Sequence, residues 1–243
     1  MHRTFVLSHY QTEPLLAARR AGEGEAETSV DLGRMSVRLQ LTDAGVALPD
    51  GSTLTWETIA EINDAAQNCF AIHDGEATPI RAFSEVTGRL ASLMPTSRVP
   101  TLVLAGIPMH RIKDVDPLED TRNKMRAIGA LRGRVLDTST GLGYTAIEAA
   151  RTASQVITIE IDPAVLEVAR QNPWSEGLWS RENTRQVVGD SFEEVARFGE
   201  GQFDAILHDP PAMRLTGDLY SGEMYRRLCR VLRRGGRLFH YVG

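Results

Sequence analysis

The 243-residue sequence contains little cysteine, little lysine and no long hydrophobic run. Its two cysteines, Cys69 and Cys229, lack the spacing of a metal site, which favours buried small side chains in a reducing cytoplasm. No apolar stretch is long enough to span a membrane, and the apolar run near the N-terminus is too short for a signal peptide. The net charge of -5 gives no global attraction to nucleic acid or to anionic membranes. We therefore expect a cytoplasmic protein without a membrane anchor.

The first part of the chain, residues 1–98, has the pattern of a small β-rich domain. Two stretches alternate apolar and polar residues around a turn, which predicts β-hairpins at 35–51 and 69–84. A short helix is expected over 54–65, and the small acidic segment 21–28 is expected to be a mobile connector.

The remaining residues, 99–243, alternate short apolar runs with helix-favouring segments. The runs typical of buried strands end at Asp137 and recur at 155–160, 184–189, 203–208 and 237–243. Helical patterns lie between them, as at 163–171, where Pro163 suits the first turn. This alternation predicts an α/β fold, in which a Rossmann-like, doubly wound parallel sheet follows the β-rich N-terminal domain.

A loop of small residues follows the first of these strands. It contains Thr138, Ser139, Gly141 and Gly143, and residues that favour a helix begin at Tyr144. Such a loop lets backbone N–H groups and the positive end of a helix approach a ligand closely. An ordinary strand-to-helix turn has the same pattern, so the loop by itself leaves both interpretations open.

Four acidic residues each stand just past the end of a predicted strand: Asp137, Glu160, Asp190 and Asp209. The carboxyl ends of the strands in a doubly wound sheet form one crevice, where ligands bind. Each acid alone could be a turn residue or a helix cap, but their shared position predicts a ligand site.

These residues resemble the motifs of the class I S-adenosylmethionine (SAM)-dependent methyltransferases, over 132–243. The family's first element is an acid followed by three alternate glycines; Asp137, Gly141 and Gly143 match it, while Ser139 replaces the first glycine. The resemblance implies SAM as the cofactor and no metal. It assigns the ribose hydroxyls to Glu160 and the adenine amino group to Asp190. It places the remaining cofactor-binding residues in the loop and beside the adenine ring: Thr138, Ser139, Ser191 and Phe192.

The segment Asp209-Pro210-Pro211 matches the family's Asp-Pro-Pro element, which is common in enzymes that methylate nitrogen. The resemblance implies that Asp209 and the proline carbonyls accept hydrogen bonds from an acceptor amine. It leaves His208 as a candidate for proton transfer. The aromatic residue that usually follows is Ala212 here. The expected acceptor is a nitrogen, or an oxygen, of a small molecule or an RNA.

Three alternatives stay open at this point. The segment from Leu219 to Gly236 also resembles the spermidine-synthase branch of the superfamily, which implies aminopropyl transfer from decarboxylated SAM. Gly141, Gly143 and Glu160 fit the fingerprint of an NAD-dependent dehydrogenase, although the charge of Asp137 would repel a pyrophosphate. A SAM-binding protein without activity is the third.

Two further segments affect the site and the assembly. Residues 87–125 lead into the glycine loop and are either a plain connector or a segment that passes over the crevice and faces substrate. After the strand near Gly243 the family normally adds one more helix and two more strands. An apolar edge at 238–242 would invite pairing, so we expect the N-terminal domain or a second copy, as a homodimer, to cover it.

Overall fold

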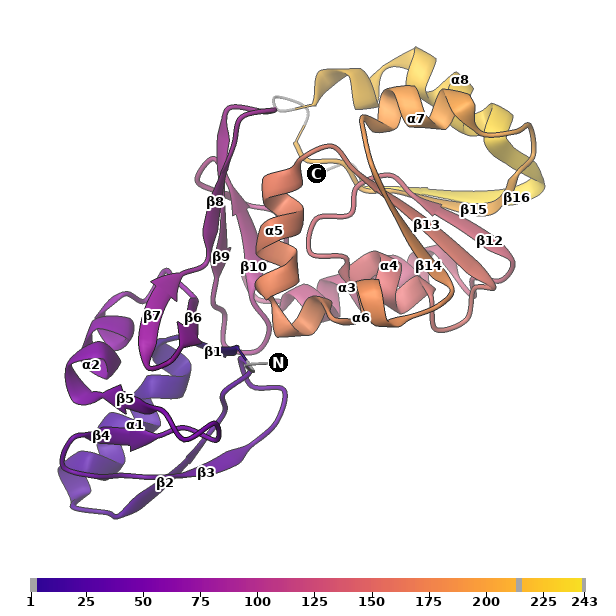
Figure 1. Ribbon diagram of the computed structural model, residues 1–243. Helices are drawn as coiled ribbons and strands as arrows, with labels where there is room; N and C mark the ends of the chain where they lie inside the picture. The colour runs from indigo at the N-terminus through magenta and orange to yellow at the C-terminus, as the bar shows by residue number, and fades with distance from the viewer. Residues whose placement is uncertain (1–3, 213–215, 242–243) are drawn as a thin grey trace.

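The computed structural model describes residues 4–212 and 216–241, and its second half is built on a five-stranded parallel sheet (Figure 1). The strand order is β14-β13-β12-β15-β16. The chain moves outward from β12 in one direction and then returns to continue from β15 in the other. This order confirms the predicted doubly wound fold and puts a topological switch point between β12 and β15. The strands are β12 (Arg134–Asp137), β13 (Gln155–Glu160), β14 (Thr184–Val188), β15 (Phe203–His208) and β16 (Leu232–His240).

Helices cover both faces of this sheet because its central strands are apolar on both sides. Val135 packs against Ala146 on one face, whereas its neighbour Leu136 lies with Leu228 in the core of the other. The first face carries α3 (Pro117–Ile128), α4 (Tyr144–Ala149) and α6 (Gly177–Ser180), and the second carries α7 (Ser191–Arg197) and α8 (Gly222–Val231) (Figure 1). Two short 3-10 helices are η1 (Pro173–Ser175) and η2 (Gly217–Tyr220).

The N-terminal part packs two helices, α1 (His9–Ala21) and α2 (Trp56–Asp64), against small antiparallel sheets. Its strands are β1 (Phe5–Leu7), β2 (Glu25–Thr28), β3 (Val37–Gln40), β4 (Gly45–Ala47), β5 (Thr53–Thr55), β6 (Phe70–His73) and β7 (Glu76–Pro79). The predicted helix over 54–65 is confirmed as α2, with the Thr55 hydroxyl accepting from the Thr58 N–H. The predicted hairpin over 69–84 is confirmed as β6 and β7.

One expectation for this part is wrong, and another holds only near its turn. The segment 21–28 is not a plain connector, because it forms β2, in which Ala26 is buried and Glu25 makes an ion pair with Arg38 of β3. In the stretch 35–51 the predicted turn forms between Thr42 and Gly45, and Leu41 pairs with Val46 across it, but beyond that pair β3 lies against β2 and β4 against β5.

A four-stranded antiparallel sheet stands between the two parts and packs against α5 (Pro163–Gln171). Its strands are β8 (Arg81–Ser84), β9 (Arg89–Met94), β10 (Thr101–Leu104) and β11 (Ile107–Pro108), in the order β11-β10-β9-β8. We call it the bridging sheet, since β9 and β10 pair across residue 98. The division of the chain at that residue stays a prediction.

The helix α8 ends at Val231, and β16 begins at once at Leu232, whereas the last strand was predicted to begin at residue 237. Its register with β15 is irregular near Leu232 and then regular from Arg237 onward. Within residues 4–212 and 216–241, no strand pairs with the outer edge of β16. Val242 and Gly243, at the end of the predicted apolar edge, lie outside the described residues. None of the described helices is both long enough and apolar enough to cross a membrane.

Candidate cofactor and acceptor site

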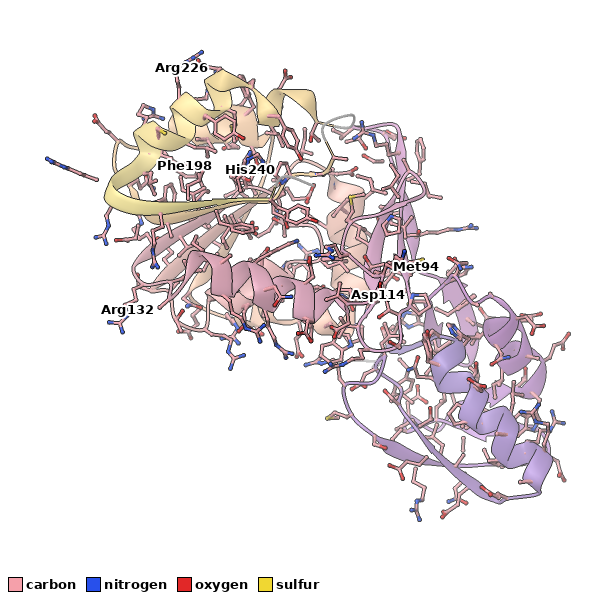
Figure 2. All side chains as sticks on the ribbon, turned by 180° about the vertical axis from the view of Figure 1, so that it is seen from behind. Met94, Asp114, Arg132, Phe198, Arg226 and His240 are labelled. Carbon is pink, nitrogen blue, oxygen red and sulfur yellow. The ribbon has the colours of Figure 1, made fainter. Side chains whose placement is uncertain are left out.

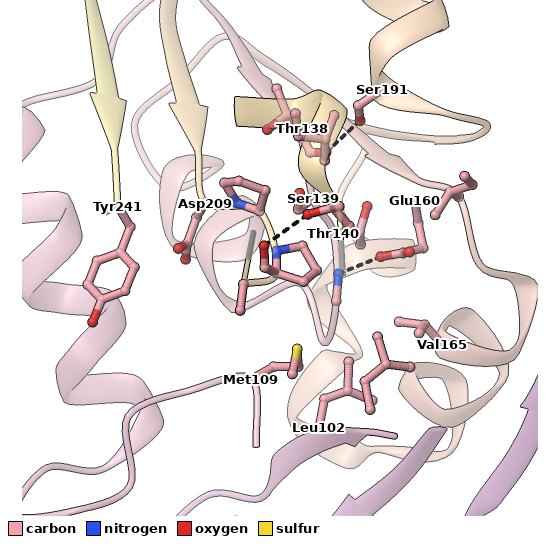
Figure 3. A pocket seen from close by; sticks show the side chains of 18 of the residues that line it. Leu102, Met109, Thr138, Ser139, Thr140, Glu160, Val165, Ser191, Asp209 and Tyr241 are labelled. Carbon is pink, nitrogen blue, oxygen red and sulfur yellow. Dashed lines mark hydrogen bonds between the residues drawn. The ribbon is translucent and has the colours of Figure 1, made fainter. Parts of the chain in front are cut away.

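A cavity of about 720 Å³ opens at the carboxyl ends of the parallel strands. One wall consists of the loop after β12 with Glu160 and Asp190, and the opposite wall includes Asp209. Figure 3 shows Asp209 and Tyr241 on one side of this space and Glu160 on the other. Residues of the bridging sheet and of α3 close the cavity, so the segment 87–125 faces the crevice instead of serving as a plain connector.

The two glycines of the loop play different structural parts. Gly141 has φ 51°, its N–H donates to Glu160 Oε2 at 2.9 Å, and an added Cβ would meet nothing nearer than Leu102 Cδ2 at 4.0 Å. The space beside Gly141 is therefore open. Gly143 has φ 77°, and its Cβ would lie 2.3 Å from Leu178 Cδ1. Gly143 does not line the cavity; its missing side chain lets α6 pack against the loop.

Asp137 lies beneath the loop, fully buried, and does not line the cavity. Its Oδ2 accepts a hydrogen bond from Thr158 Oγ1 at 2.8 Å, and Thr145 Oγ1 lies 3.5 Å from the same oxygen. Burial raises the pKa of Asp137 to about 7, because the charged carboxylate loses its hydration there. Thr138 and Ser139 above it line the cavity, and the Thr138 carbonyl accepts from Ser191 Oγ at 2.5 Å.

Glu160 lies at the end of β13 with its carboxylate against the loop. Oε2 accepts from Gly141 and Oε1 from the Asp162 N–H at 3.1 Å, while burial raises the pKa of Glu160 to about 7. A carboxylate offers about four acceptor positions. Glu160 can therefore accept hydrogen bonds from further hydroxyl groups. The two hydroxyls of a ribose are suitable donors, and the open space beside Gly141 leaves room for a nucleoside.

The neighbouring strand end contributes Asp190 and Ser191, which both line the cavity. Asp190 is exposed, and its Oδ1 caps α7 by accepting from the Phe192 N–H at 2.8 Å. The Phe192 ring itself lies elsewhere, since Arg227 stacks on it with 3.8 Å between the guanidinium carbon and the ring centroid. The structure thus brings Glu160, Asp190 and Ser191 together and leaves the Phe192 ring outside the cavity.

The opposite wall carries a lysine that sequence reasoning did not assign to the site. Lys124 Nζ lies 2.6 Å from Asp209 Oδ2 and 2.8 Å from Asp120 Oδ2, and all three residues line the cavity. Asp120 and Lys124 are four residues apart on α3, a spacing that places both on one helix face. That spacing was visible in the sequence, but the pairing with Asp209, 85 residues away, was not.

The Asp-Pro-Pro segment is held in place by a tyrosine. The Tyr220 hydroxyl lies 3.3 Å from the Pro210 carbonyl and 3.1 Å from the Pro211 carbonyl, to which it donates. These carbonyls, expected to receive an acceptor amine, therefore already have a partner. Ala212 lines the cavity as well, and Tyr220 and Tyr241 supply there the aromatic rings that the sequence lacks after the two prolines.

His208 is fully buried behind the cavity and does not line it. Its Nε2 lies 2.8 Å from the Leu219 carbonyl, which can only accept, so Nδ1 accepts from the Thr138 hydroxyl at 2.7 Å. Burial lowers the pKa of His208 to about 4, so the ring is neutral near pH 7. In this position His208 ties the glycine loop to η2.

Across the part of the chain that the structure describes, no three His, Cys, Asp or Glu side chains are arranged to hold a metal ion. A glycine loop at the switch point, with an acid at the end of the adjacent strand, is the arrangement of a nucleotide-cofactor domain. The fold and the site therefore define a Rossmann-like cofactor-binding domain.

Comparison with known proteins identifies the kind of domain. Residues 135–236 match the family model described as a methyltransferase domain. The matched segment is a methyltransferase domain, and SAM is the cofactor of such domains.

Curated relatives cover different parts of the chain. An uncharacterized protein of Methanocaldococcus jannaschii is 43% identical over 196 residues, which is 80% of this chain and 66% of that protein. The ribosomal protein L11 methyltransferase of Deinococcus radiodurans is 36% identical over 112 residues, covering 44% of this chain and 40% of the relative. The chain therefore spans less than two thirds of the length of these relatives.

Among solved structures, a spermidine synthase in complex with the transition-state analogue AdoDATO is similar, with a TM-score of 0.55 and 19% identity. The match covers 66% of this chain and 58% of that one. The spermidine synthase of Thermotoga maritima gives a TM-score of 0.52 at 19% identity, with coverages of 63% and 53%. At this level of identity the likeness shows the fold.

Proposed function

We propose that the protein transfers a methyl group from SAM to a nitrogen, or an oxygen, of an acceptor that is a small molecule or an RNA. The observation that carries the proposal is that Glu160 and Asp209 line one cavity from its two sides (Figure 3), and that the space beside Gly141, which also lines it, is open. One side suits a nucleoside cofactor, and the other offers the partly exposed carboxylate of Asp209 to an acceptor.

In this proposal the residues of the two walls have separate roles. Bound SAM supplies the electrophilic methyl group. Glu160 accepts hydrogen bonds from the ribose, and Asp190 accepts one from the adenine amino group. Asp209 accepts a hydrogen bond from the acceptor. This bond directs the lone pair of the acceptor nitrogen or oxygen toward the methyl group of SAM. Most of the rate then comes from orientation in a site with little water.

Aminopropyl transfer from decarboxylated SAM is the second candidate. It is favoured by the similarity to spermidine synthases, one of which was solved with a transition-state analogue bound. A polyamine aminopropyltransferase of Mycobacterium tuberculosis is also 33% identical over 95 residues, which is 37% of this chain and 18% of that protein.

Calorimetric titration tests the donor directly. SAM and its demethylated product should bind, and decarboxylated SAM and NAD should bind at least about tenfold more weakly. Glu160→Ala should weaken SAM binding at least about tenfold, because a charge-assisted hydrogen bond is worth roughly 1.5–3 kcal/mol. The exposed Glu200→Ala serves as the matched control. Preferred binding of decarboxylated SAM would instead support aminopropyl transfer, and unchanged SAM affinity in folded Glu160→Ala would remove the assignment of Glu160.

A cytoplasmic location and a homodimer also belong to the proposal. Both cysteines are free, Cys69 buried and Cys229 exposed, which suits a reducing compartment. The unpaired outer edge of β16 within the described residues offers a surface for a second copy. Sedimentation velocity at several protein concentrations tests the dimer, and a single monomeric species at all of them would contradict it.

A further inference from the structure

Lys124 occupies the centre of a buried charged triad on the acceptor wall. Its Nζ lies between Asp209 Oδ2 at 2.6 Å and Asp120 Oδ2 at 2.8 Å, and it stands 4.9 Å from the centroid of the Tyr241 ring. The Lys124 side chain is only 7% exposed, and that of Asp209 is 19% exposed. The Asp116 side chain caps the start of α3 by accepting hydrogen bonds from the Leu118 and Glu119 N–H groups. This cap fixes the beginning of the helix that carries Lys124.

The geometry explains why Asp209 requires a cation beside it. Burial raises the pKa of Asp209 above its ordinary value, whereas the positive charge and hydrogen bond of Lys124 act in the opposite direction. The negative charge of Asp120 adds to the rise and His240 opposes it. The titratable groups that face the pair come from α3, β12, η2, the end of β16 with the residue after it, and the loop that follows β11: Asp120, Asp137, Tyr220, His240, Tyr241 and His110.

We propose that Lys124 is a positioning residue for the methyl transfer, which keeps Asp209 ionised and holds its Oδ2. The second oxygen of Asp209, Oδ1, then remains to accept a hydrogen bond from the acceptor. This inference rests on the proposed function, because it assigns Lys124 a task only if Asp209 receives the acceptor. The acceptor must offer an N–H or O–H donor to a carboxylate whose orientation is already fixed.

The ionisation of Asp209 can be measured without any cofactor or acceptor. The protein is labelled with [13Cγ]aspartate, and the signal that Asp209→Asn removes is followed by NMR from pH 3 to 9. In Lys124→Met the midpoint of this signal should rise by about one pH unit or more, because an adjacent cation lowers a carboxyl pKa by about that much. Lys124→Arg, which keeps the charge, should restore the midpoint to within about half a pH unit of the wild type.

The chain supplies a matched control, since Lys113 is its only other lysine and is exposed. Lys113→Met should leave the midpoint of Asp209 unchanged. An unchanged midpoint in folded Lys124→Met would overturn the proposal. If Lys124→Met does not fold, Lys124→Gln decides instead: it removes the positive charge but keeps a polar group, so the midpoint should rise, and an unchanged or lowered midpoint would overturn the proposal.

The same preparations separate this inference from the proposed function. If SAM titration fails while the midpoint of Asp209 moves as expected, the cofactor assignment is wrong and the Lys124–Asp209 coupling stands. If SAM binds and the midpoint does not move, the positioning role of Lys124 is wrong. With an acceptor in hand, the acid limb of the pH–rate profile should shift upward in Lys124→Met, with the larger change in kcat, and an unshifted limb would overturn the proposal.

Discussion

At the residue scale, the proposed reaction depends on the carboxylate of Asp209. Asp209→Asn should lower methyl transfer by about a hundredfold, because misplacing an oriented group costs on that order in rate. It should shift SAM affinity less than about tenfold, because Asp209 lies on the wall opposite Glu160. A methyl-transfer assay with labelled SAM, applied to amine and RNA fractions of the source cell, measures the first quantity, and calorimetry measures the second.

The control for this variant is Asp114→Asn, an exposed substitution with φ 61° that asparagine tolerates. If Asp209→Asn lowered the melting temperature and left the methyl-transfer rate of the folded protein unchanged, Asp209 would stabilise the turn after β15 and have no part in the reaction.

The two loop glycines predict different outcomes for the same substitution. Gly143→Ala should destabilise the protein by about 2–4 kcal/mol, since its Cβ would overlap Leu178 and its backbone is left-handed. Gly141→Ala should cost only about 1–2 kcal/mol, the price of the left-handed conformation. Denaturant unfolding compares the two variants. Equal losses of stability would show that Leu178 moves aside without cost.

Buried acids make the stability of the protein depend on pH. The pKa of Asp137 is raised to about 7 in the folded protein, so the folded state binds more protons than the unfolded chain between about pH 4 and pH 7. The contribution of Asp137 is therefore fully present below pH 4 and is lost as the pH rises through 7. The slope of unfolding free energy against pH should become less negative in Asp137→Asn, by at most about 1.4 kcal/mol per pH unit. Parallel slopes for the two proteins would contradict the raised pKa.

At the scale of secondary structure, α8 holds the end of α7 through one arginine. The Arg230 guanidinium donates to the carbonyls of Val195, Ala196 and Phe198, the last acceptors of α7. One basic side chain of α8 thus caps the neighbouring helix. Arg226, by contrast, pairs with Glu223 on its own helix, is 73% exposed and is labelled at the outer side of α8 in Figure 2.

Arg230→Ala should therefore lower the free energy of unfolding by about 1–3 kcal/mol, because it removes three hydrogen bonds at the end of α7. Arg226→Ala should change it by less than about 0.5 kcal/mol, as expected for an exposed pair on one helix. Urea unfolding of both variants measures the difference, and equal effects would remove the capping role of Arg230.

The elements that the sequence predicted most accurately are those buried on both sides. The predicted strands 155–160 and 203–208 coincide with β13 and β15, because fully buried parallel strands are continuous apolar runs. The helix 163–171 coincides with α5, whose start is marked by Asp162 and Pro163. The strand β2 was missed because its burial depends on packing against α1, which local composition does not reveal.

The candidate site was predictable to the level of strand ends, but not of side-chain direction. Glu160, Asp190 and Asp209 line the cavity as their positions indicated, whereas Asp137 turns beneath the loop. Which way a residue points after a strand depends on the loop's hydrogen bonds, and these join residues distant in sequence. Lys124 escaped prediction for the same reason, since its partner Asp209 belongs to another element.

At the scale of the whole molecule, a small group of polar contacts joins the N-terminal part to the methyltransferase domain. Trp174 Nε1 donates to the Leu32 carbonyl at 3.0 Å, and Arg34 bonds to the Pro173 carbonyl and pairs with Glu176. The same region reaches the glycine loop, because Ser175 Oγ donates to the Leu142 carbonyl at 2.7 Å.

Trp174→Phe should remove about 1 kcal/mol of stability by deleting one hydrogen bond, which corresponds to a melting temperature lower by about 2–4 °C. Trp179→Phe is the matched control, since the Trp179 indole N–H is buried without a hydrogen-bond partner. Calorimetric melts compare the two. A loss in Trp179→Phe as large as that in Trp174→Phe would show that ring size, and not the hydrogen bond, accounts for the effect.

The cavity described above takes its two walls from different stretches of the chain. The cofactor wall comes from the loop after β12 and the ends of β13 and β14, while much of the facing wall comes from residues 87–124, ahead of that loop. Apart from Asp209, Tyr220 and Tyr241, the facing wall can therefore change by substitution in a stretch that does not contain the glycine loop, Glu160 or Asp190. Recombination near residue 131, where the chain passes from α3 to β12, would exchange that stretch as a block and would keep Asp209 together with the residues of the cofactor wall. Related genes can in this way differ in the acceptors that their products methylate and keep the same methyl donor.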